Sequence, residues 1–334
     1  MKVSKPCYYD DFHCLAGSCP DSCCKEWDVD VDEASAANYR SLPGPLGDRL
    51  RQVLHSTGGG AVMAIEEGRC PMWRPDGLCR IQAELGEQAL CRVCRQFPRL
   101  RHDYGSFAEL GLELSCPEAA RLILSEAEGE TIRFDDGQPS EEGCDEEALA
   151  ILLETREKAL SLLNRAENPG DGLTLLLLYG YQAQEQLDGG EEEEFSPAEA
   201  LKTAAALKRE PDIPGFLDYF KKLEILTEQW KKLLDQPHSP SLPPQLGNLA
   251  RYLIQRYWLQ AVSDYDLVCR VKFIVISCLL VGLLGGDFPR TAQLFSKEIE
   301  NDADNVDAIL DAAYEVRAFA DDRLLGMLQM GKGD

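Results

Sequence analysis

The hydrophobic positions in the C-terminal two thirds of the chain recur at helical spacing. Beyond residue 145, apolar residues fall mostly three or four positions apart, as on the buried face of an amphipathic helix. Gly189-Gly190 and a run of prolines between 237 and 244 interrupt this pattern, and residues 264–266 offer a further point of division. The pattern predicts helices over Asp145–Arg165, Leu173–Leu187, Ala198–Lys208, Gly215–Leu234, Leu246–Leu284, Arg290–Asn301 and Val306–Gln329.

The first 120 residues follow a different pattern and carry little helical signal. Their cysteines stand among Gly, Pro, Asp and Ser, the residues of tight turns. Polar and apolar residues alternate over 28–32, which predicts either a brief strand or a lead into a helix capped near Asp32. They alternate again over 110–114, which predicts another short strand. A further helix is expected to start at Pro117, because proline is well tolerated at a first helical position.

These patterns predict a mainly α protein in three parts. Residues 1–125 are expected to form an irregular, cysteine-rich, metal-binding region with a few short strands. Residues 126–145 are acidic and contain glycine, which indicates a linker, and residues 146–334 are expected to form an α-helical domain.

The most apolar run, Phe273–Leu284, has 12 residues. A bilayer-spanning helix needs about 20, so we expect a buried core helix and no membrane insertion. The opening residues lack the apolar core of a signal peptide. We therefore expect a cytoplasmic location.

Negative charge is concentrated in one segment. The net charge is −24, and residues 121–200, with 5 Lys/Arg against 21 Asp/Glu, supply −16 of it. Such a chain repels phosphate backbones, so nucleic acid is not an expected partner, whereas a basic or lysine-bearing partner would be attracted. An acidic stretch of this kind is also typical of a solvated face that aids solubility.

Ten of the thirteen cysteines lie in the first 116 residues. An odd number of cysteines in a reducing compartment argues against a disulfide framework. One group comprises Cys14, Cys19, Cys23 and Cys24; a second comprises Cys70, Cys79, Cys91 and Cys94, with Cys116 alone further along. Thiolates are soft ligands that suit zinc and iron–sulfur clusters, and turn-forming residues between them let the sulfurs converge.

The identity of the metal is left open by the spacing. A structural zinc site normally shows paired C-x₂₋₄-C units, which the adjacent Cys23-Cys24 and the long gaps fit poorly, whereas iron–sulfur clusters tolerate scattered ligands. Buried structural thiols are the alternative to metal binding. His13 and His102 stand beside the cysteine motifs and are further candidate ligands.

Three motifs carry a resemblance to a known family. The first motif is Phe12-x-Cys14-x₄-Cys19-Pro-Asp-Ser-Cys23-Cys24-x₂-Trp27. The second is residues 70–99 (CPMWRPDGLCRIQAELGEQALCRVCRQFPR), and the third is residues 114–122 (LSCPEAARL). Together they resemble flagellin lysine-N-methylases of the FliB type, which belong with proteins carrying a CxxCxxCC-type zinc- or iron-chelating region. A looser similarity covers residues 251–267. The detailed match covers about the first third of the chain.

The resemblance implies an iron–sulfur protein that transfers methyl groups from S-adenosylmethionine to lysine ε-amines of flagellin in a bacterial cytoplasm. It implies a [4Fe–4S] cluster, with zinc as the alternative metal. By motif position, the metal ligands are Cys14, Cys19, Cys23, Cys24, Cys70, Cys79, Cys94 and Cys116. One such cluster needs four ligands, so eight candidates mean either a second site or some cysteines that are not ligands.

An S-adenosylmethionine site cannot be read from the sequence. The glycine-rich residues 55–60 lack a surrounding strand–loop–helix unit, and Glu26 stands where a radical enzyme's third cysteine would be. A cofactor pocket would then lie in the helical part or at its junction with the cysteine-rich part. The candidates for positioning or proton removal are Trp27, Asp103, Tyr104, Arg251, Tyr252, Arg256, Tyr257, Asp264 and Asp266.

Two other functions remain open at this point. One is a non-catalytic zinc- or iron–sulfur-binding module, in which metal supplies folding free energy and the helices bind a partner. The other is an electron carrier, for which the sequence offers no clear second cofactor. For Arg256 and Tyr257, which stand among apolar residues, core packing competes with any functional role.

Overall fold

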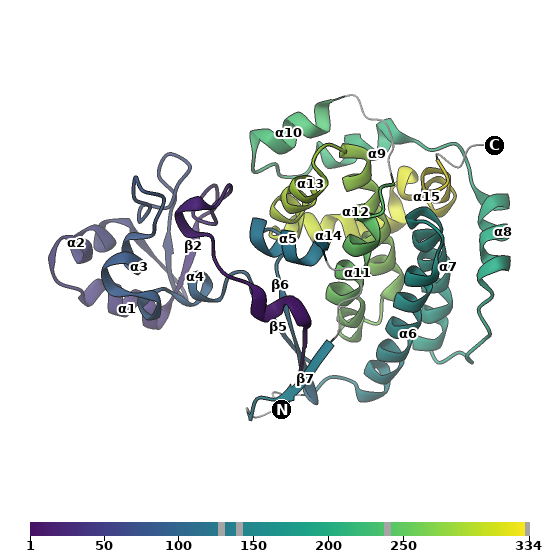
Figure 1. Ribbon diagram of the computed structural model, residues 1–334, viewed down its shortest axis with the longest axis horizontal. Coiled ribbons are helices and arrows are strands. Elements are labelled where there is room, and N and C mark those ends of the chain that lie inside the picture. Colours follow the sequence, from purple (N-terminus) through teal and green to yellow (C-terminus); the bar gives the residue numbers. More distant parts are fainter. Residues whose placement is uncertain (126–130, 138–142, 237–241, 331–334) are drawn as a thin grey trace.

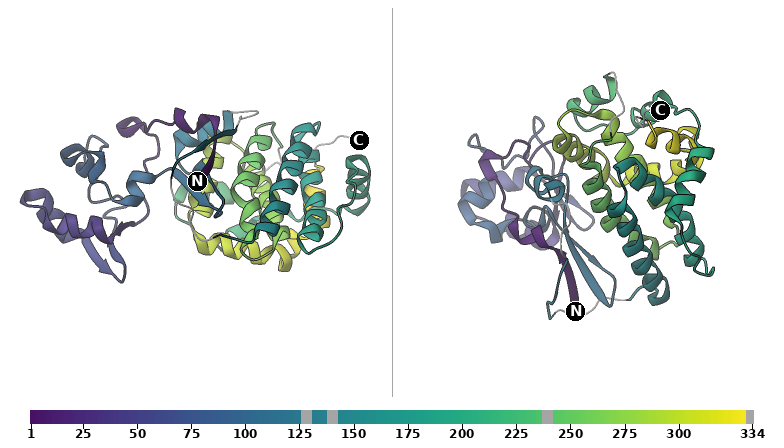
Figure 2. Two further views of the ribbon diagram at one scale, coloured as in Figure 1. Left: turned by 90° about the horizontal axis from the view of Figure 1, so that it is seen from below. Right: turned by 45° about the vertical axis from the view of Figure 1, so that its right-hand side comes forward.

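The buried hydrophobic residues divide into two clusters, and each organises one lobe of the protein. The computed structural model describes residues 1–125, 131–137, 143–236 and 242–330. The smaller cluster draws its members from residues 29–91, and the larger contains Tyr8, Phe12 and residues from Tyr104 onward. Figure 1 shows the corresponding small lobe beside a larger helical body, and Figure 2 shows the same separation from two further directions. The predicted region 1–125 thus contributes to both cores.

The small lobe packs short helices against a three-stranded antiparallel sheet with strand order β2-β4-β3. Its elements are β2 (Val29–Asp32), α1 (Glu33–Ser41), α2 (Gly44–Val53), β3 (Leu54–Thr57), β4 (Gly60–Met63), α3 (Arg80–Leu85) and α4 (Arg92–Gln96). The Asp32 side chain accepts a hydrogen bond from the Ser35 backbone N–H and so caps α1, as the sequence predicted. The glycine-rich residues 55–60 lie in the β3–β4 hairpin, in which Thr57 pairs with Gly60.

A second, four-stranded sheet lies against the helical body. Its strands are β1 (Lys2–Pro6), β5 (Arg99–Asp103), β6 (Phe107–Leu112) and β7 (Thr131–Asp135), in the order β5-β6-β1-β7. β1 pairs with β6 in parallel and with β7 in antiparallel orientation. The first residues of the chain are therefore held between segments more than 100 positions away.

The body consists of helices whose apolar faces share one core. They are α5 (Pro117–Ser125), α6 (Glu146–Arg165), α7 (Pro169–Leu187), α8 (Pro197–Leu207), α9 (Ile213–Phe220), α10 (Glu228–Asp235), α11 (Leu246–Tyr257), α12 (Leu267–Leu284), α13 (Phe288–Phe295), α14 (Ala303–Glu315) and α15 (Asp321–Leu328). A π-helical turn, Ser296–Glu300, follows α13 directly. Among the described residues, α12 is long and apolar enough to span a membrane, but it is buried along its whole length as the central core helix (Figure 1).

The fold class predicted from the sequence is confirmed, as are the helices at α6 and α8 and the helix beginning at Pro117. Two long helices were predicted wrongly. Residues 215–234 divide into α9 and α10, because the Thr227 hydroxyl accepts from the Trp230 N–H and starts a new helix. Residues 306–329 divide into α14 and α15, and the turn between them places Phe319 against the rings of Phe216 and Tyr219.

The N-terminal part contains more regular structure than its composition indicated. Helices α2 to α4 fall where little helical signal was found, because each is short and draws its stability from the small core rather than from its own periodicity. Within the predicted linker 126–145, residues 131–135 form strand β7, and α6 is capped by Asp145. Residues 126–130 and 138–142 of that predicted linker lie outside the described residues.

Candidate functional site

All thirteen cysteines are free thiols, and nine of them gather in two neighbouring groups. We define the first thiol group as Cys14, Cys19, Cys23 and Cys116, and the second as Cys24, Cys70, Cys79, Cys91 and Cys94. Each group joins cysteines that are far apart in the sequence. Cys7, Cys144, Cys269 and Cys278 belong to neither group.

The members of the first group act on one another electrostatically. Burial raises the pKa of Cys116 to about 11, with further contributions from the thiols of Cys19 and Cys14. A hydrogen bond with Cys24, burial, and the neighbouring thiols of Cys14 and Cys116 hold the pKa of Cys23 far above its usual range. The residue that the sequence left alone, Cys116, thus joins the cysteines of the opening motif.

The second group lies inside the core of the small lobe, where Cys70 and Cys91 are buried. Burial raises the pKa of Cys70 to about 12, and the thiols of Cys24, Cys79 and Cys91 add to this effect. Cys91 and Cys94 share a hydrogen bond that lowers the pKa of Cys91 to about 7 and raises that of Cys94 strongly. Cys91, which was not among the ligands inferred from motif position, therefore belongs to this group.

These donor sets suit a thiophilic metal. In each close pair, Cys23–Cys24 and Cys91–Cys94, one thiol ionises readily only while its neighbour keeps its proton. A bound cation removes that conflict, because it compensates several thiolates together. Four thiols in one group and five in the other are enough for a Cys₄ site in each. Within the part of the chain that the structure describes, no three His, Cys, Asp or Glu side chains lie at the spacing of ligands to a single metal ion.

One buried lysine ties the cysteine loop to the helical body. Lys297, in the π-helical turn and only 2% exposed, pairs with Asp21 at 3.1 Å and with Glu26, and its Nζ lies 5.1 Å from the centroid of the Trp27 ring. Arg290 of α13 pairs with the same Asp21 carboxylate at 3.0 Å. Lys297 and Arg290 together lower the pKa of Asp21, against the opposing effect of burial. The loop between Cys19 and Cys24 is thus fixed against helices of the body.

Gln293, on α13, connects the two segments of the chain that carry the first thiol group. Its side-chain amide donates to the Ser115 carbonyl at 2.7 Å and to Asp21 at 3.2 Å. Ser115 precedes Cys116, and Asp21 lies between Cys19 and Cys23. The helical body therefore sets the distance between cysteines that the sequence separates by more than 90 residues.

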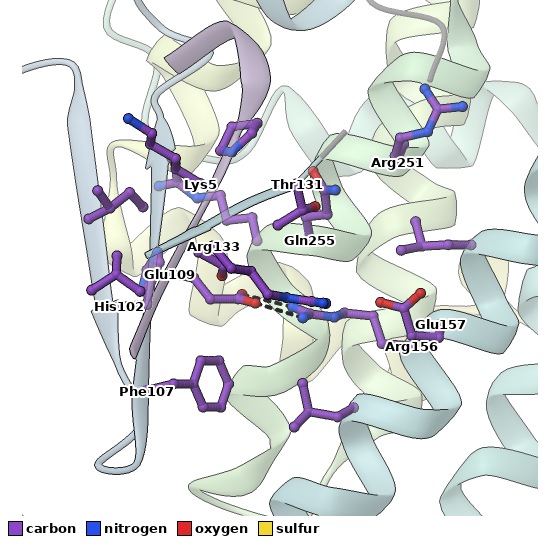
Figure 3. Close-up of a pocket in the computed structure, with 18 of the residues that line it drawn as sticks. Lys5, His102, Phe107, Glu109, Thr131, Arg133, Arg156, Glu157, Arg251 and Gln255 are labelled. Atoms are coloured by element: carbon purple, nitrogen blue, oxygen red, sulfur yellow. Dashed lines mark hydrogen bonds and ion pairs between the residues drawn. The ribbon is translucent and has the colours of Figure 1, made fainter. Parts of the chain in front are cut away.

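A cavity of about 1300 Å³ lies between the four-stranded sheet and helices α6 and α11. One cross-strand row forms much of its sheet wall: His102, Glu109, Ser4 and Arg133 are register partners across β5, β6, β1 and β7. Register partners share one face of a sheet. All four residues line the cavity, and Figure 3 shows Glu109 and Arg133 directed toward the helices.

The helical wall supplies mostly basic and polar side chains. Arg156 of α6 donates two hydrogen bonds to the Glu109 carboxylate, at 2.8 and 2.7 Å, and so bridges helix and sheet (Figure 3). α11 contributes Arg251, Tyr252, Gln255 and Arg256, which the sequence placed in a stretch of looser family similarity. The cavity therefore combines the N-terminal strands with the helical body.

Behind this wall a buried network connects the cavity to the cysteine side. Glu300 of the π-helical turn lies 3.2 Å from the Arg256 guanidinium, and it accepts hydrogen bonds from the hydroxyls of Tyr252 and Tyr257. The Tyr252 hydroxyl also accepts from the Leu114 N–H, two residues before Cys116. One π-helical turn thus contacts the cysteine loop through Lys297 and the cavity wall through Glu300.

The other sequence candidates have structural roles. Asp264 pairs with Arg270 at 2.8 Å, and Asp266 caps α12 by accepting from the Cys269 N–H. Asp103 accepts from the Gly105 N–H, and Tyr104 stacks on Phe107. His13 contacts the Asp11 carbonyl, so neither it nor His102, which lines the cavity, lies in a thiol group.

The sequence analysis missed Glu109, Arg133, Arg156 and Lys297. A signal existed for Arg156, because it stands on the apolar stripe of α6 between Leu152 and Ala159, where a charged residue needs a buried partner. No comparable signal marks Arg133, whose place depends on the pairing of β7 with β1.

The chain is similar to curated bacterial proteins over 133 residues. It is 31% identical to the flagellar biosynthetic protein FliU of Salmonella muenchen, in a match that covers 38% of this chain and 79% of FliU. It is also 31% identical to lysine-N-methylases of Salmonella choleraesuis and Salmonella typhimurium, over 38% of this chain and 33% of each relative. The chain thus spans about a third of the lysine-N-methylases that it matches. No family model and no solved structure matches it. Because the match extends over most of FliU, this chain belongs to the family that contains FliU and the FliB-type lysine-N-methylases.

Proposed function

We propose that this protein is a protein-lysine N-methyltransferase that acts in the cytoplasm on lysine ε-amines of flagellin, with S-adenosylmethionine as the methyl donor. The names of the relatives support lysine methylation and a flagellar setting. The observation that carries the proposal is the large cavity at the junction of the N-terminal strands with α6 and α11. The sequence placed a cofactor pocket either in the helical part or at its junction with the cysteine-rich part, and this cavity lies at such a junction.

The cavity offers a group that can accept the proton released in methyl transfer. In this reaction the lysine Nζ lone pair forms a bond to the methyl carbon, the carbon–sulfur bond breaks, and the donor leaves as a neutral thioether. The lysine must lose a proton before it attacks. Burial and the nearby charge of Arg256 lower the pKa of His102, so its imidazole is neutral at physiological pH. Its Nε2 is buried and has no hydrogen-bond partner among the described residues.

We propose that the two thiol groups hold metal, including a [4Fe–4S] cluster, with zinc as the alternative occupant. Such a group would supply a compact centre that fixes the loops carrying Cys19 to Cys24 and Cys116. Lys297 and Gln293 then transmit the position of these loops to the helices behind the cavity.

The experiment is methyl transfer by protein prepared anaerobically and replete in iron. With S-adenosylmethionine and flagellin from the same bacterium, we expect methyllysine in the flagellin, detected by mass spectrometry. His102→Gln should lower kcat by about 100-fold or more. The matched control is His55→Gln, in the exposed β3–β4 hairpin and outside the cavity, which should retain activity. Absence of methyllysine with the wild-type protein would reject the proposal.

A second function is favoured by the packing of the small lobe. Its second thiol group sits inside a small hydrophobic cluster, as expected of a structural metal site in a non-catalytic binding module. That function predicts colourless protein with stoichiometric zinc and no binding of S-adenosylmethionine by calorimetry. A brown sample containing iron and acid-labile sulfide, together with methyl transfer, would exclude it.

A further inference from the structure

The cavity is positively charged within a strongly acidic protein. Seven of its lining residues are Lys or Arg and three are Asp or Glu, whereas the whole chain has a net charge of −24. Two of the three carboxylates already bind cations: Glu109 pairs with Arg156, and Asp135 pairs with the N-terminal ammonium group at 3.0 Å. At physiological salt charges are screened over about 8 Å, so the lining and not the distant acidic surface decides which charge enters. The lining favours an anionic ligand.

Three of the lining cations keep their charge available. Lys2 of β1, Arg133 of β7 and Arg165 of α6 are exposed and form no ion pair within the described parts of the chain. Figure 3 shows the Arg133 side chain extending from the sheet toward α6. The available positive charge therefore comes from both the sheet wall and the helical wall.

The cavity is long as well as positive. Its lining follows α6 from Leu153 to Arg165, which is about 18 Å at a rise of 1.5 Å per residue. An extended chain rises about 3.3 Å per residue, so this length accommodates five or six residues of a strand. A single carboxylate or phosphate would fill only a small part of it.

Strand β7 offers the backbone groups that such a strand needs. It is the last strand of the sheet, and among the described residues it pairs with β1 alone. All five of its residues are exposed, including Ile132 and Phe134. The outer edge of a terminal strand presents unpaired N–H and C=O groups, to which an extended peptide can add as a further strand. Thr131, Arg133 and Asp135 also line the cavity, so the edge and the positive lining belong to one surface.

We propose that an extended, acidic segment of a partner polypeptide adds to the outer edge of β7 and directs alternate carboxylates toward Arg133 and Arg165. The inference rests on the proposed function for the identity of the partner, which is then the protein substrate. The methylated lysine would be one with Asp or Glu two residues away, because residues at that spacing share one face of a strand. The arginines bind and orient the segment, and they take no part in the transfer of the methyl group.

The test uses three labelled nine-residue peptides with capped ends and a central lysine. The first is Asp-Thr-Asp-Thr-Lys-Thr-Asp-Thr-Asp, and the second has Asn in place of each Asp. The third, Thr-Asp-Thr-Asp-Lys-Asp-Thr-Asp-Thr, has the composition of the first with its carboxylates on the opposite face. Fluorescence anisotropy with the full chain, prepared anaerobically, should show the first peptide binding about 10-fold more tightly than either of the others, because several partly exposed ion pairs add.

Substitutions in the protein locate the binding surface. Arg133→Gln should weaken binding of the first peptide by about 3- to 10-fold, and Arg133→Lys should retain most of the affinity, because the charge remains. Neither should change the affinity for the Asn peptide. Arg317→Gln, which removes an exposed arginine outside the cavity, should change none of the affinities. Equal affinity for the three peptides, or indifference of the first peptide to Arg133→Gln, would overturn the inference.

Changes in the peptide backbone test the addition of a strand. Alternate N–H groups of an added strand point toward its neighbour. Methylation of one alternate set of backbone nitrogens in the first peptide should therefore abolish binding, whereas methylation of the other set should have a smaller effect. Unchanged affinity in both methylated peptides would overturn the addition to β7.

The outcomes separate this inference from the proposed function. If flagellin is methylated while the three peptides bind equally, the function stands and the docking surface lies elsewhere. If the first peptide binds in the way expected but no flagellin lysine is methylated, the docking surface stands and the proposed function falls. If neither selective binding nor methylation occurs, both proposals fall.

Discussion

The two lobes of this protein reach stability by different routes. The helical body buries α12 completely and contains large, fully buried side chains such as Trp258 and Phe273. The small lobe has a much smaller apolar cluster, and cysteines make up part of it. Burial of apolar surface contributes roughly 25 cal/mol per Å², so a small core alone is marginal. Metal binding by the thiols would supply what the small core lacks.

This difference also separates two kinds of cysteine. Cys278 lies at the centre of α12 with no exposed surface, and burial alone raises its pKa. The pKa of Cys70 responds both to burial and to three neighbouring thiols. Cys278 therefore behaves as a small apolar residue, whereas Cys70 belongs to a group of neighbouring thiols.

The largest effect should follow removal of metal. Anaerobic treatment with a strong chelator is expected to abolish the structure of the small lobe and to leave the body folded. Hydrogen exchange followed by mass spectrometry would detect this as a loss of amide protection in residues 29–94, with protection of α12 unchanged. Retention of protection in residues 29–94 after complete metal removal would show that the small core suffices.

The next largest effect concerns the connection between the lobes. Lys297→Met removes the buried cation and leaves Asp21 and Glu26 without their shared partner. Breaking a buried ion pair typically costs about 3–5 kcal/mol. Urea unfolding should show a loss of this size. The control is Lys221→Met, which breaks half-exposed pairs on the surface and should cost less than about 1 kcal/mol.

A repeat of the measurement in Lys297→Met/Asp21→Asn distinguishes charge from packing. Neutralising Asp21 should recover part of the lost free energy of unfolding, since one uncompensated carboxylate is removed. If the double variant is as unstable as the single one, the role of Lys297 is the packing of its stem against Trp27 and not the ion pairs.

A Cys→Ser substitution should lower the stability when it is made in the body and the metal content when it is made in the small lobe. Cys278→Ser buries a hydroxyl without a suitable partner and should lower the free energy of unfolding by about 1–3 kcal/mol, with metal content unchanged. Cys70→Ser should lower the metal content measured by elemental analysis. A loss of metal in Cys278→Ser, or full metal content in Cys70→Ser, would contradict the division of the cysteines.

The helices of the body were largely predictable, because the spacing of apolar residues in long segments such as α6 indicates both a helix and its buried face. The division of the cysteines was not. Cys23 and Cys24 are adjacent in the sequence and share a hydrogen bond, yet Cys14 and Cys116 contribute to the pKa shift of Cys23, whereas Cys24 contributes to the pKa shifts of Cys70 and Cys79. Spacing along the chain cannot reveal such a divergence.

The cavity was unpredictable for a related reason. Its sheet wall depends on the register of β1 between β6 and β7, segments more than 100 residues from the start of the chain. Pairing over such distances is set by the packed fold and leaves no local pattern. The clearest traces in the sequence were Arg251, Tyr252 and Arg256 of the helical wall, which lie in the stretch of looser family similarity.

The smallest expected effect concerns the helix cap that Asp32 forms inside the small lobe. The Asp32 carboxylate accepts from the Ser35 N–H at 3.0 Å and from the Arg92 N–H at 2.9 Å, and so joins the starts of α1 and α4. These backbone donors, that of Arg92 foremost, lower the pKa of Asp32 from 3.8 to about 2. Because the folded pKa is the lower one, the stabilisation is complete above pH 3.8 and disappears as the pH falls through 2.

Asp32→Ala should cost about 0.5–2 kcal/mol at neutral pH, measured by urea unfolding of the small lobe. Asp32→Asn keeps an acceptor oxygen but cannot ionise, so it should retain most of the cap and lose this pH dependence. Asp30→Ala, exposed on the same strand, should change neither quantity, and an equal effect of Asp30→Ala would show that the charge of β2 matters rather than the two hydrogen bonds.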